Sequence, residues 1–238
     1  MTQALKLISS MATRQLLAEL AATHKQATGQ AIELEAVGGV DAARRVQSGE
    51  AFDVVVLAKA AIVQLSAAGR VLGESLRDLV LSGISVAVRS GCAHPRIESE
   101  QALRETIQQA RTIGYSTGPS GTHLLGLLER WGLRQQMGDR IVQAPPGVPV
   151  ASLVADGSVE LGFQQLSELI HAPGIEVIGP LPPGTQQMTA FTAAIVSGSE
   201  QIDAARAFIA FMASPAAHEA KRHQGMEPAE LGLRSPIR

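Results

Sequence analysis

The chain has 238 residues, of which 45% are hydrophobic and 18% charged, and its formal net charge is −2. This length can bury one large or two small cores, and the apolar content excludes a disordered chain. The balanced charge argues against a nucleic-acid binder, and no apolar run reaches the roughly 18 residues that span a bilayer. Cys92 is the single cysteine, which excludes an intrachain disulfide and a cysteine metal cluster.

The N-terminus enters an apolar, strand-like run at once. No charged segment followed by a long apolar stretch and a cleavage site comes before this run. As written, the sequence therefore predicts a cytoplasmic protein. A periplasmic location is expected only if a leader has been removed.

The first third of the chain alternates patterns typical of strands and helices. Apolar or alternating runs predict strands, whereas apolar residues three or four apart predict helices. In chain order we expect a strand at 5–9, a helix at 13–28, a strand at 31–37, a helix at 41–47, a strand at 53–57 and a helix at 59–68. The DVVVL run at 53–57 is typical of a strand buried on both faces. Short β-α-β units of this kind imply a parallel sheet with right-handed crossovers.

A long β-rich stretch at 79–90, interrupted by Gly83, is suited to carry the chain from one domain into another. A second β-α series follows, with helices at 99–110, 121–131 and 148–155 and strands at 112–116, 140–143 and 159–163. After an apolar run at 175–179 and the PLPPG break come a β-rich segment at 188–196 and helices at 203–213 and 215–223. The tail after Met226 is expected to be irregular.

These patterns predict an α/β protein with two lobes. Residues 1–82 and 188–238 would form lobe one, and residues 83–187 would form lobe two. The two strand-like crossings near 80–90 and 185–195 would join the lobes, with a ligand cleft between them.

No nucleotide, metal-protease or hydrolase motif is present. The six histidines lie far apart or on polar faces, without metal-ligand spacing. We therefore expect neither a metal nor a cofactor.

Four strand-to-helix turns carry glycine, serine or threonine where a helix begins, at residues 9–13, 38–39, 117–121 and 145–147. In an open parallel sheet such turns lie at the carboxyl ends of the strands, where ligands bind. Free N–H groups at helix N-termini bind anions without help from lysine or arginine. Ordinary helix capping explains any one of these turns. Four of them, divided between two units, favour a ligand site.

Several segments together resemble the periplasmic molybdate-binding proteins, a branch of the type II solute-binding fold that has aconitate isomerase-like members. The segments are ISSMATRQLLAEL, GGVDAARRVQSGEAFDVVVLAKAAIVQLSAAGRV, YSTGPSGTHLLGLLERWGL, VASLVADGSVELGFQQLSEL and AARAFIAFMASPAAHEAKRHQGMEP. The resemblance covers nearly the whole chain. It implies two lobes, each a sheet flanked by helices, joined by a two-strand hinge and closing on an anion.

The resemblance also implies a set of ligand contacts. They fall on Ser10, Val40, Ser120, Gly147 or Val148, and Gln165. The strand-to-helix turns add Ser9, Gly39 and Gly121 as candidate ligand-binding residues. Val40 stands where the family has a serine, and Gln165 stands where it has a tyrosine. The loss of two hydroxyl groups favours a small organic carboxylate over molybdate, because the carbon skeleton can pack near Val40.

Three functions are compatible with these features. The leading hypothesis is a solute-binding protein for a small anion, with an ABC transporter permease as its partner if the protein is exported. The alternative is an isomerase of an unsaturated carboxylate, with His123, in the first turn of a helix, as the proton-transferring base. Asp41 is the second candidate base, although its position also suits helix capping. A ligand-sensing domain ranks last because the chain has no segment for a helix-turn-helix.

Overall fold

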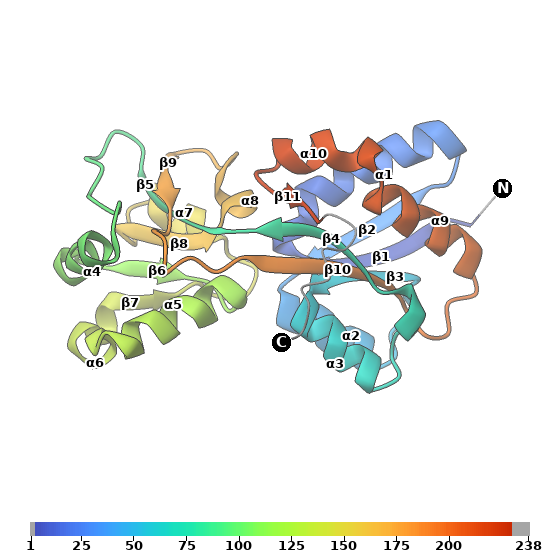
Figure 1. The fold of residues 1–238 in the computed structure, drawn as a ribbon, viewed down its shortest axis with the longest axis horizontal. Helices are drawn as coiled ribbons and strands as arrows, with labels where there is room; N and C mark the ends of the chain where they lie inside the picture. The colour runs from blue at the N-terminus through green and yellow to red at the C-terminus, as the bar shows by residue number, and fades with distance from the viewer. Residues whose placement is uncertain (1–2, 230–238) are drawn as a thin grey trace, which may run out of the picture.

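Two α/β units lie side by side in the computed structural model, which describes residues 3–229 (Figure 1). The strands of the first unit are β1 (Leu5–Ser10), β2 (Ile32–Val37), β3 (Val54–Ala58), β4 (Arg77–Ser82), β10 (Thr189–Ile195) and β11 (Glu227–Pro228). Those of the second are β5 (Ile84–Arg89), β6 (Ile113–Tyr115), β7 (Ile141–Gln143), β8 (Leu161–Gln165) and β9 (Ile175–Pro180). The strand orders are β11-β4-β10-β3-β1-β2 and β7-β6-β8-β5-β9.

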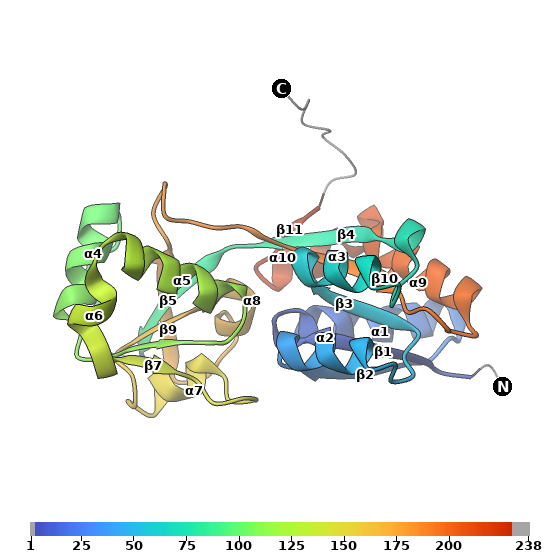
Figure 2. The same cartoon turned by 90° about the horizontal axis from the view of Figure 1, so that it is seen from below.

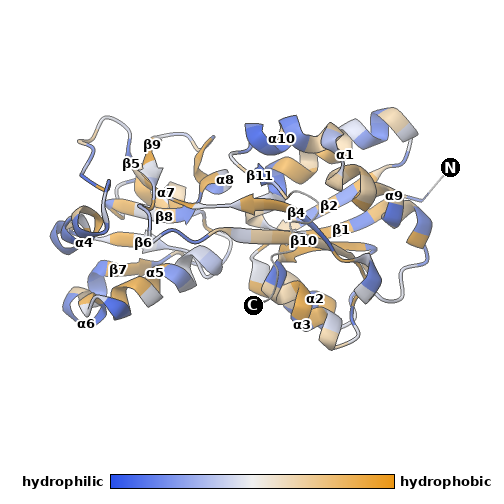
Figure 3. Cartoon of the chain, viewed as in Figure 1, coloured by the Kyte–Doolittle hydropathy of each residue, from blue (hydrophilic) through white to orange (hydrophobic). Residues whose placement is uncertain are grey.

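Helices cover both faces of each sheet. The first unit has η1 (Met11–Thr13), α1 (Arg14–Thr28), α2 (Gly39–Gln47), α3 (Lys59–Ala67), η2 (Gly73–Ser75), α9 (Ile202–Ala213), η4 (Pro215–Ala217) and α10 (His218–His223). The second has α4 (Glu100–Gln109), α5 (Pro119–Arg130), α6 (Leu133–Met137), η3 (Gly138–Arg140), α7 (Val150–Ala155) and α8 (Leu166–Leu169). Figure 3 shows that most of the sheet strands are hydrophobic.

Strand β3 shows why the sheets need two helical layers. Val54 and Val56 pack into the core beneath α1 and α9, whereas Val55 and Leu57 pack into the core beneath α2 and α3. Successive side chains on a strand point to opposite faces, so a continuous apolar run buries both. The expectation for residues 53–57 is confirmed.

The chain passes between the units twice, along the same side of the molecule (Figure 2). It leaves the first sheet at Gly83, between β4 and β5, and returns through residues 181–188, between β9 and β10. Gln186 fastens the two crossings together, because its side chain accepts from the Ile84 N–H (2.9 Å) and donates to the Ile84 carbonyl (2.9 Å). The exchange of sheets at both crossings fits the hinge expected from the sequence.

Three details differ from the sequence-based expectations. The stretch at 79–90 is two strands in different sheets, because the chain changes sheet at Gly83. The sheets are mixed, since β10 runs antiparallel to β3 and β4 and β5 runs antiparallel to β8 and β9. After Met226, Glu227 and Pro228 form β11 against β4 rather than an irregular tail, and residues 230–238 lie outside the described part of the chain.

Candidate functional site

The end of β1 places Ser10 at the start of η1 with an unused hydroxyl group. Ser10 is buried, its side chain caps no helix N–H, and its Oγ has no hydrogen-bond partner within residues 3–229. Ser99 behaves as an ordinary cap by comparison, since its Oγ accepts from the Ala102 N–H at 3.1 Å. Capping therefore does not explain Ser10. Its neighbour Ser9 is also buried, but donates to the Ser10 carbonyl (3.2 Å).

The second turn lies directly against the first. A Cβ added at Gly39 would lie 3.6 Å from the Ser10 Cβ, so the start of α2 and the start of η1 are neighbours. Gly38 caps α2 without a side chain, and Val40 is 66% exposed. The structure thus brings Ser10 and Gly39 together and leaves the Val40 side chain accessible.

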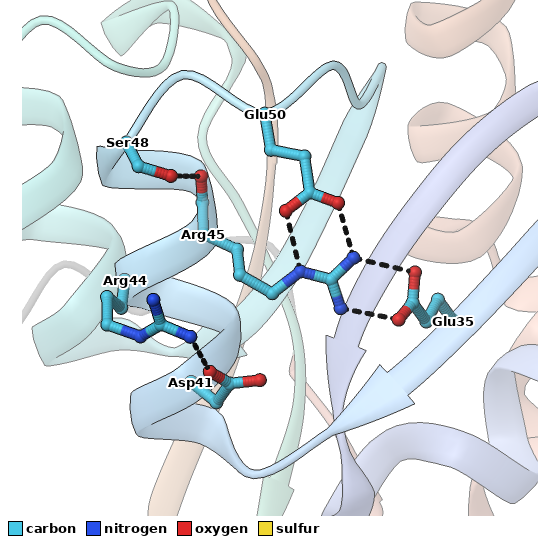
Figure 4. A network of polar contacts seen from close by, with 6 residues as sticks. All are labelled: Glu35, Asp41, Arg44, Arg45, Ser48 and Glu50. Carbon is cyan, nitrogen blue, oxygen red and sulfur yellow. Dashed lines mark hydrogen bonds and ion pairs between the residues drawn. The ribbon is translucent and has the colours of Figure 1, made fainter.

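Asp41 does not cap α2, and instead pairs with Arg44 on the exposed surface (Figure 4). Next to it, the Arg45 guanidinium bridges Glu35 on β2 and Glu50 beyond α2. These pairs hold the pKa of both glutamates below the usual range. The network fixes α2 to the sheet and so positions its N-terminal turn.

In the second unit, the first turn of α5 packs too tightly against the preceding loop for any residue but glycine at one position. A Cβ at Gly121 would lie 1.7 Å from the Ser116 carbonyl oxygen. Gly118 caps α5 without a side chain, and Ser120 is buried with its Oγ 3.5 Å from the Ser116 Oγ. The first-turn N–H groups of α5 are therefore free of side-chain caps, as those of α2 are.

The fourth turn is the weakest of the set. Gly147 adopts φ +78°, which favours glycine, and Val148 is 37% exposed. The helix that follows, α7, has six residues and an uncapped N-terminus. A helix this short has only a small dipole, so Gly147 and Val148 contribute shape more than charge.

Gln165 ties the hinge together. In the amide orientation that satisfies its neighbours, its nitrogen donates to the Ser82 carbonyl (3.0 Å) and its oxygen accepts from the Thr189 hydroxyl (3.0 Å). Ser82 and Thr189 belong to the two strands that cross between the units. The side chain predicted to contact the ligand is thus also a link between the crossings.

His123 points toward the second crossing. Its Nε2 lies 2.6 Å from the Thr185 carbonyl oxygen, to which the ring N–H donates. The other ring nitrogen, Nδ1, remains the atom that can accept a proton. The structure therefore gives His123 a positioning contact on the hinge, and its role as a base stays a prediction.

Two ionisable residues near the boundary between the units were missed by sequence reasoning. Glu168 lies on α8, accepts a hydrogen bond from the Gln164 Nε2 (2.7 Å), and has its pKa raised to about 7 by burial. Lys221 on α10 is completely buried, and burial lowers its pKa to about 8. Neither has a motif around it, and only the packing of the folded chain around these side chains reveals them.

The two units touch near these residues. Helix α8 of the second unit contacts η1 of the first, directly after Ser10. Within residues 3–229, no group of three or more His, Cys, Asp or Glu side chains is placed to hold a metal ion. No helix in the same range has the length and hydropathy of a membrane span. The arrangement suits an anion held by N–H groups and hydroxyls.

The family model for bacterial extracellular solute-binding proteins matches residues 5–227, and the chain belongs to this family. Among curated relatives, aconitate isomerase from Pseudomonas sp. is 35% identical over 233 residues, or 94% of this chain and 87% of the relative. The periplasmic molybdate-binding protein of Azotobacter vinelandii has a similar structure, with a TM-score of 0.79 and 22% identity over 93% of this chain and 98% of that one. The sulfate-binding protein of Mycobacterium tuberculosis H37Rv gives a TM-score of 0.78 with 16% identity, over 96% and 88% of the two chains.

These likenesses confirm the type II solute-binding fold, with two sheets flanked by helices, and the resemblance to molybdate-binding proteins. The family match makes solute binding the coarse function of the chain.

Proposed function

We propose that the protein binds a small organic carboxylate where its two lobes meet, with the division into lobes at residues 82/83 and 187/188. The observation that carries the proposal is the hydroxyl of Ser10, which is buried, caps nothing and has no partner in the described chain. Leaving a buried hydroxyl unbonded costs about 1–3 kcal/mol, a cost that a bound oxygen ligand would remove. The uncapped N-termini of α2 and α5 add free N–H donors.

The side chains favour carboxylate over a bare tetrahedral oxyanion. Val40 presents an apolar surface beside Gly39 and Ser10. An apolar carbon skeleton therefore has a surface to contact. The Gln165 amide is hydrogen-bonded to the strands of the hinge, at Ser82 and Thr189. Aconitate, the compound in the name of the 35% identical relative, is a tricarboxylate, which supports the same ligand class.

Isothermal titration calorimetry and thermal unfolding test this proposal. Citrate, tricarballylate, trans-aconitate, succinate, sulfate and molybdate are compared at one ionic strength. We expect submillimolar binding of an organic acid and a rise in Tm that grows with its concentration. Tight binding of molybdate or sulfate alone, or no binding of any of the six, contradicts the proposal.

The second candidate is an isomerase of an unsaturated carboxylate, favoured by the 35% identity to aconitate isomerase over 94% of the chain. The reaction needs one group that removes a proton beside a carboxylate and returns it to another carbon. His123 is the base predicted from the sequence, and its Nδ1 would be the accepting atom. NMR of trans-aconitate incubated with the protein detects the cis isomer directly, and unchanged turnover in His123→Ala would remove His123 from the mechanism.

Location separates the two candidates. A binding protein that delivers its ligand to an ABC transporter permease acts outside the cytoplasm, whereas an isomerase can act on either side of the membrane. Fractionation of the native cells, with detection by antibody, shows which compartment holds the protein. An exclusively cytoplasmic protein would rule out the transporter partner.

A further inference from the structure

Buried polar atoms without partners gather in one part of the molecule. Five side-chain atoms of this kind occur within residues 3–229, namely Ser10 Oγ, Gln164 Oε1, Ser167 Oγ, Lys221 Nζ and Gln224 Oε1. They lie on three segments, which are the start of η1, the end of β8 with α8, and α10 with its C-terminal cap. Buried polar groups nearly always have partners, so each of these atoms calls for one, either a water molecule or a polar ligand.

These three segments touch one another. Helix α8 contacts η1, and α10 contacts α1, which continues η1. At the end of α10, a Cβ on Gly225 would lie 2.9 Å from Leu166 Cδ2 of α8, and His171 Nε2 lies 3.1 Å from the His223 carbonyl oxygen. Figure 1 shows α8 at the edge of its unit that faces α10 and β11. The segments that carry the unpaired atoms thus meet along one stretch of the boundary between the units.

Lys221 stands apart in this group because it carries a full charge. Its exposed fraction is 0%, and on α10 it is buried together with Ala220, as are Ala217 just before the helix and Gln224 at its C-terminal cap. Its Nζ has no acceptor in the described chain. Burying an ammonium group without an anion is strongly unfavourable, and burial accordingly lowers the lysine pKa to about 8. At neutral pH the group is still mostly protonated, so the site holds a positive charge that lacks its counterion.

We propose that Lys221 is the positively charged residue of the ligand site, and that its ammonium group pairs with one carboxylate of a small polycarboxylate bound between η1, α8 and α10. This inference rests on the proposed function. The hydroxyls of Ser10 and Ser167, from the two lobes, are the neutral donors for the same oxygens. Because these groups come from both lobes, the ligand would fasten one lobe to the other.

Lys221→Met tests the proposal, since methionine keeps most of the side-chain volume without the charge. Lys25→Met, on the exposed side of α1, is the matched control. Calorimetry with tricarballylate and citrate, and unfolding without ligand, are measured for all three proteins. We expect K221M to lose about tenfold to a hundredfold in affinity, as for a charged hydrogen bond, and to be at least as stable as the wild type without ligand. K25M should match the wild type in affinity and in stability without ligand.

The outcomes separate this inference from the proposed function. If the wild type binds none of the acids, the proposed function fails and this inference fails with it. If the wild type binds and K221M binds equally well, only the role of Lys221 is refuted. If K221M is destabilised without ligand while K25M is not, Lys221 is structural, and the inference is also refuted.

Proton uptake gives a second measurement that needs no variant of Lys221. Pairing with a carboxylate raises the lysine pKa, so the wild type should take up a fraction of a proton on binding at pH 9, seen as a difference between binding enthalpies in two buffers. Glu19, Glu168, His171 and His223 also lie on the packed elements. Glu168→Gln should keep the uptake, whereas an uptake of zero in the wild type contradicts the proposal.

Discussion

Glu168→Gln should remove a pH dependence of stability that the structure assigns to one carboxyl group. Burial raises the pKa of Glu168 from 4.5 to about 7, against the opposing effect of the hydrogen bond from Gln164. A folded-state pKa above the unfolded value means that the folded protein holds this proton more tightly. The associated stability is therefore fully present below about pH 4.5 and is lost as the pH rises through about 7.

The magnitude follows from the size of the shift. A change from 4.5 to about 7 corresponds to at most about 3 kcal/mol at 1.36 kcal/mol per pKa unit, less what the accessible part of the side chain recovers from water. Glutamine resembles the protonated acid and still accepts from Gln164. E168Q should thus match the wild type near pH 5 and exceed it by about 1–3 kcal/mol at pH 8.

Urea unfolding between pH 5 and pH 8 measures this difference. Glu129→Gln is the matched control, because the Glu129 side chain is 71% exposed on α5. Its stability difference from the wild type should not change between pH 5 and pH 8. The stability gained by E168Q over the wild type should be larger at pH 8 than at pH 5. The same gain at both pH values would show that burial does not raise the pKa of Glu168.

Three further substitutions test the site itself. Ser10→Ala should keep the free energy of unfolding or raise it by up to about 3 kcal/mol, because it removes a buried hydroxyl without partners in the described chain. The same substitution should lower carboxylate affinity about tenfold in calorimetry. Gly121→Ala should lower the free energy of unfolding by more than about 2 kcal/mol, since the added Cβ would lie 1.7 Å from the Ser116 carbonyl oxygen. Gly126→Ala in the same helix is the control, because open space surrounds that position and the substitution should be neutral or stabilising. Gln165→Leu should lower the free energy of unfolding by about 1–3 kcal/mol even without ligand, because it removes the hydrogen bonds to Ser82 and Thr189. A loss of ligand affinity with unchanged stability would contradict the role of Gln165 in the hinge.

Local sequence patterns were enough to predict most of the helices and strands. The apolar run at 53–57 and the helical spacing in 13–28 need only local periodicity, and both elements form within a residue or two of the expected bounds. Helix α8 escaped prediction because a single turn shows no period. Strand β11 escaped because Glu227 and Pro228 look like a turn, and only pairing with β4 makes them a strand.

Residues of the candidate site could be predicted only where they lie in a strand-to-helix turn. Glycine and serine at the ends of strands indicated Ser10, Gly39 and Ser120, and the structure places Ser10 against Gly39. The burial of Lys221 could not be foreseen, because it sits in the polar run HEAKRH, which is typical of a solvated helix. Its helix is covered by α1, which is distant in sequence. Burial of a charge is a tertiary property, so local composition does not reveal it.

Charge counting explains why a site of this kind would need one lysine. A helix N-terminus acts as roughly half a positive charge, so η1 with α1, α2 and α5 together supply about +1.5. That nearly balances a dianion such as sulfate or a dicarboxylate without any basic side chain. A tricarboxylate at neutral pH brings about one charge more, and Lys221 provides one. In the K221M titrations, the loss of affinity should therefore be larger for tricarballylate than for succinate. An equal loss for both would mean that Lys221 recognises a carboxylate common to them and does not select the third.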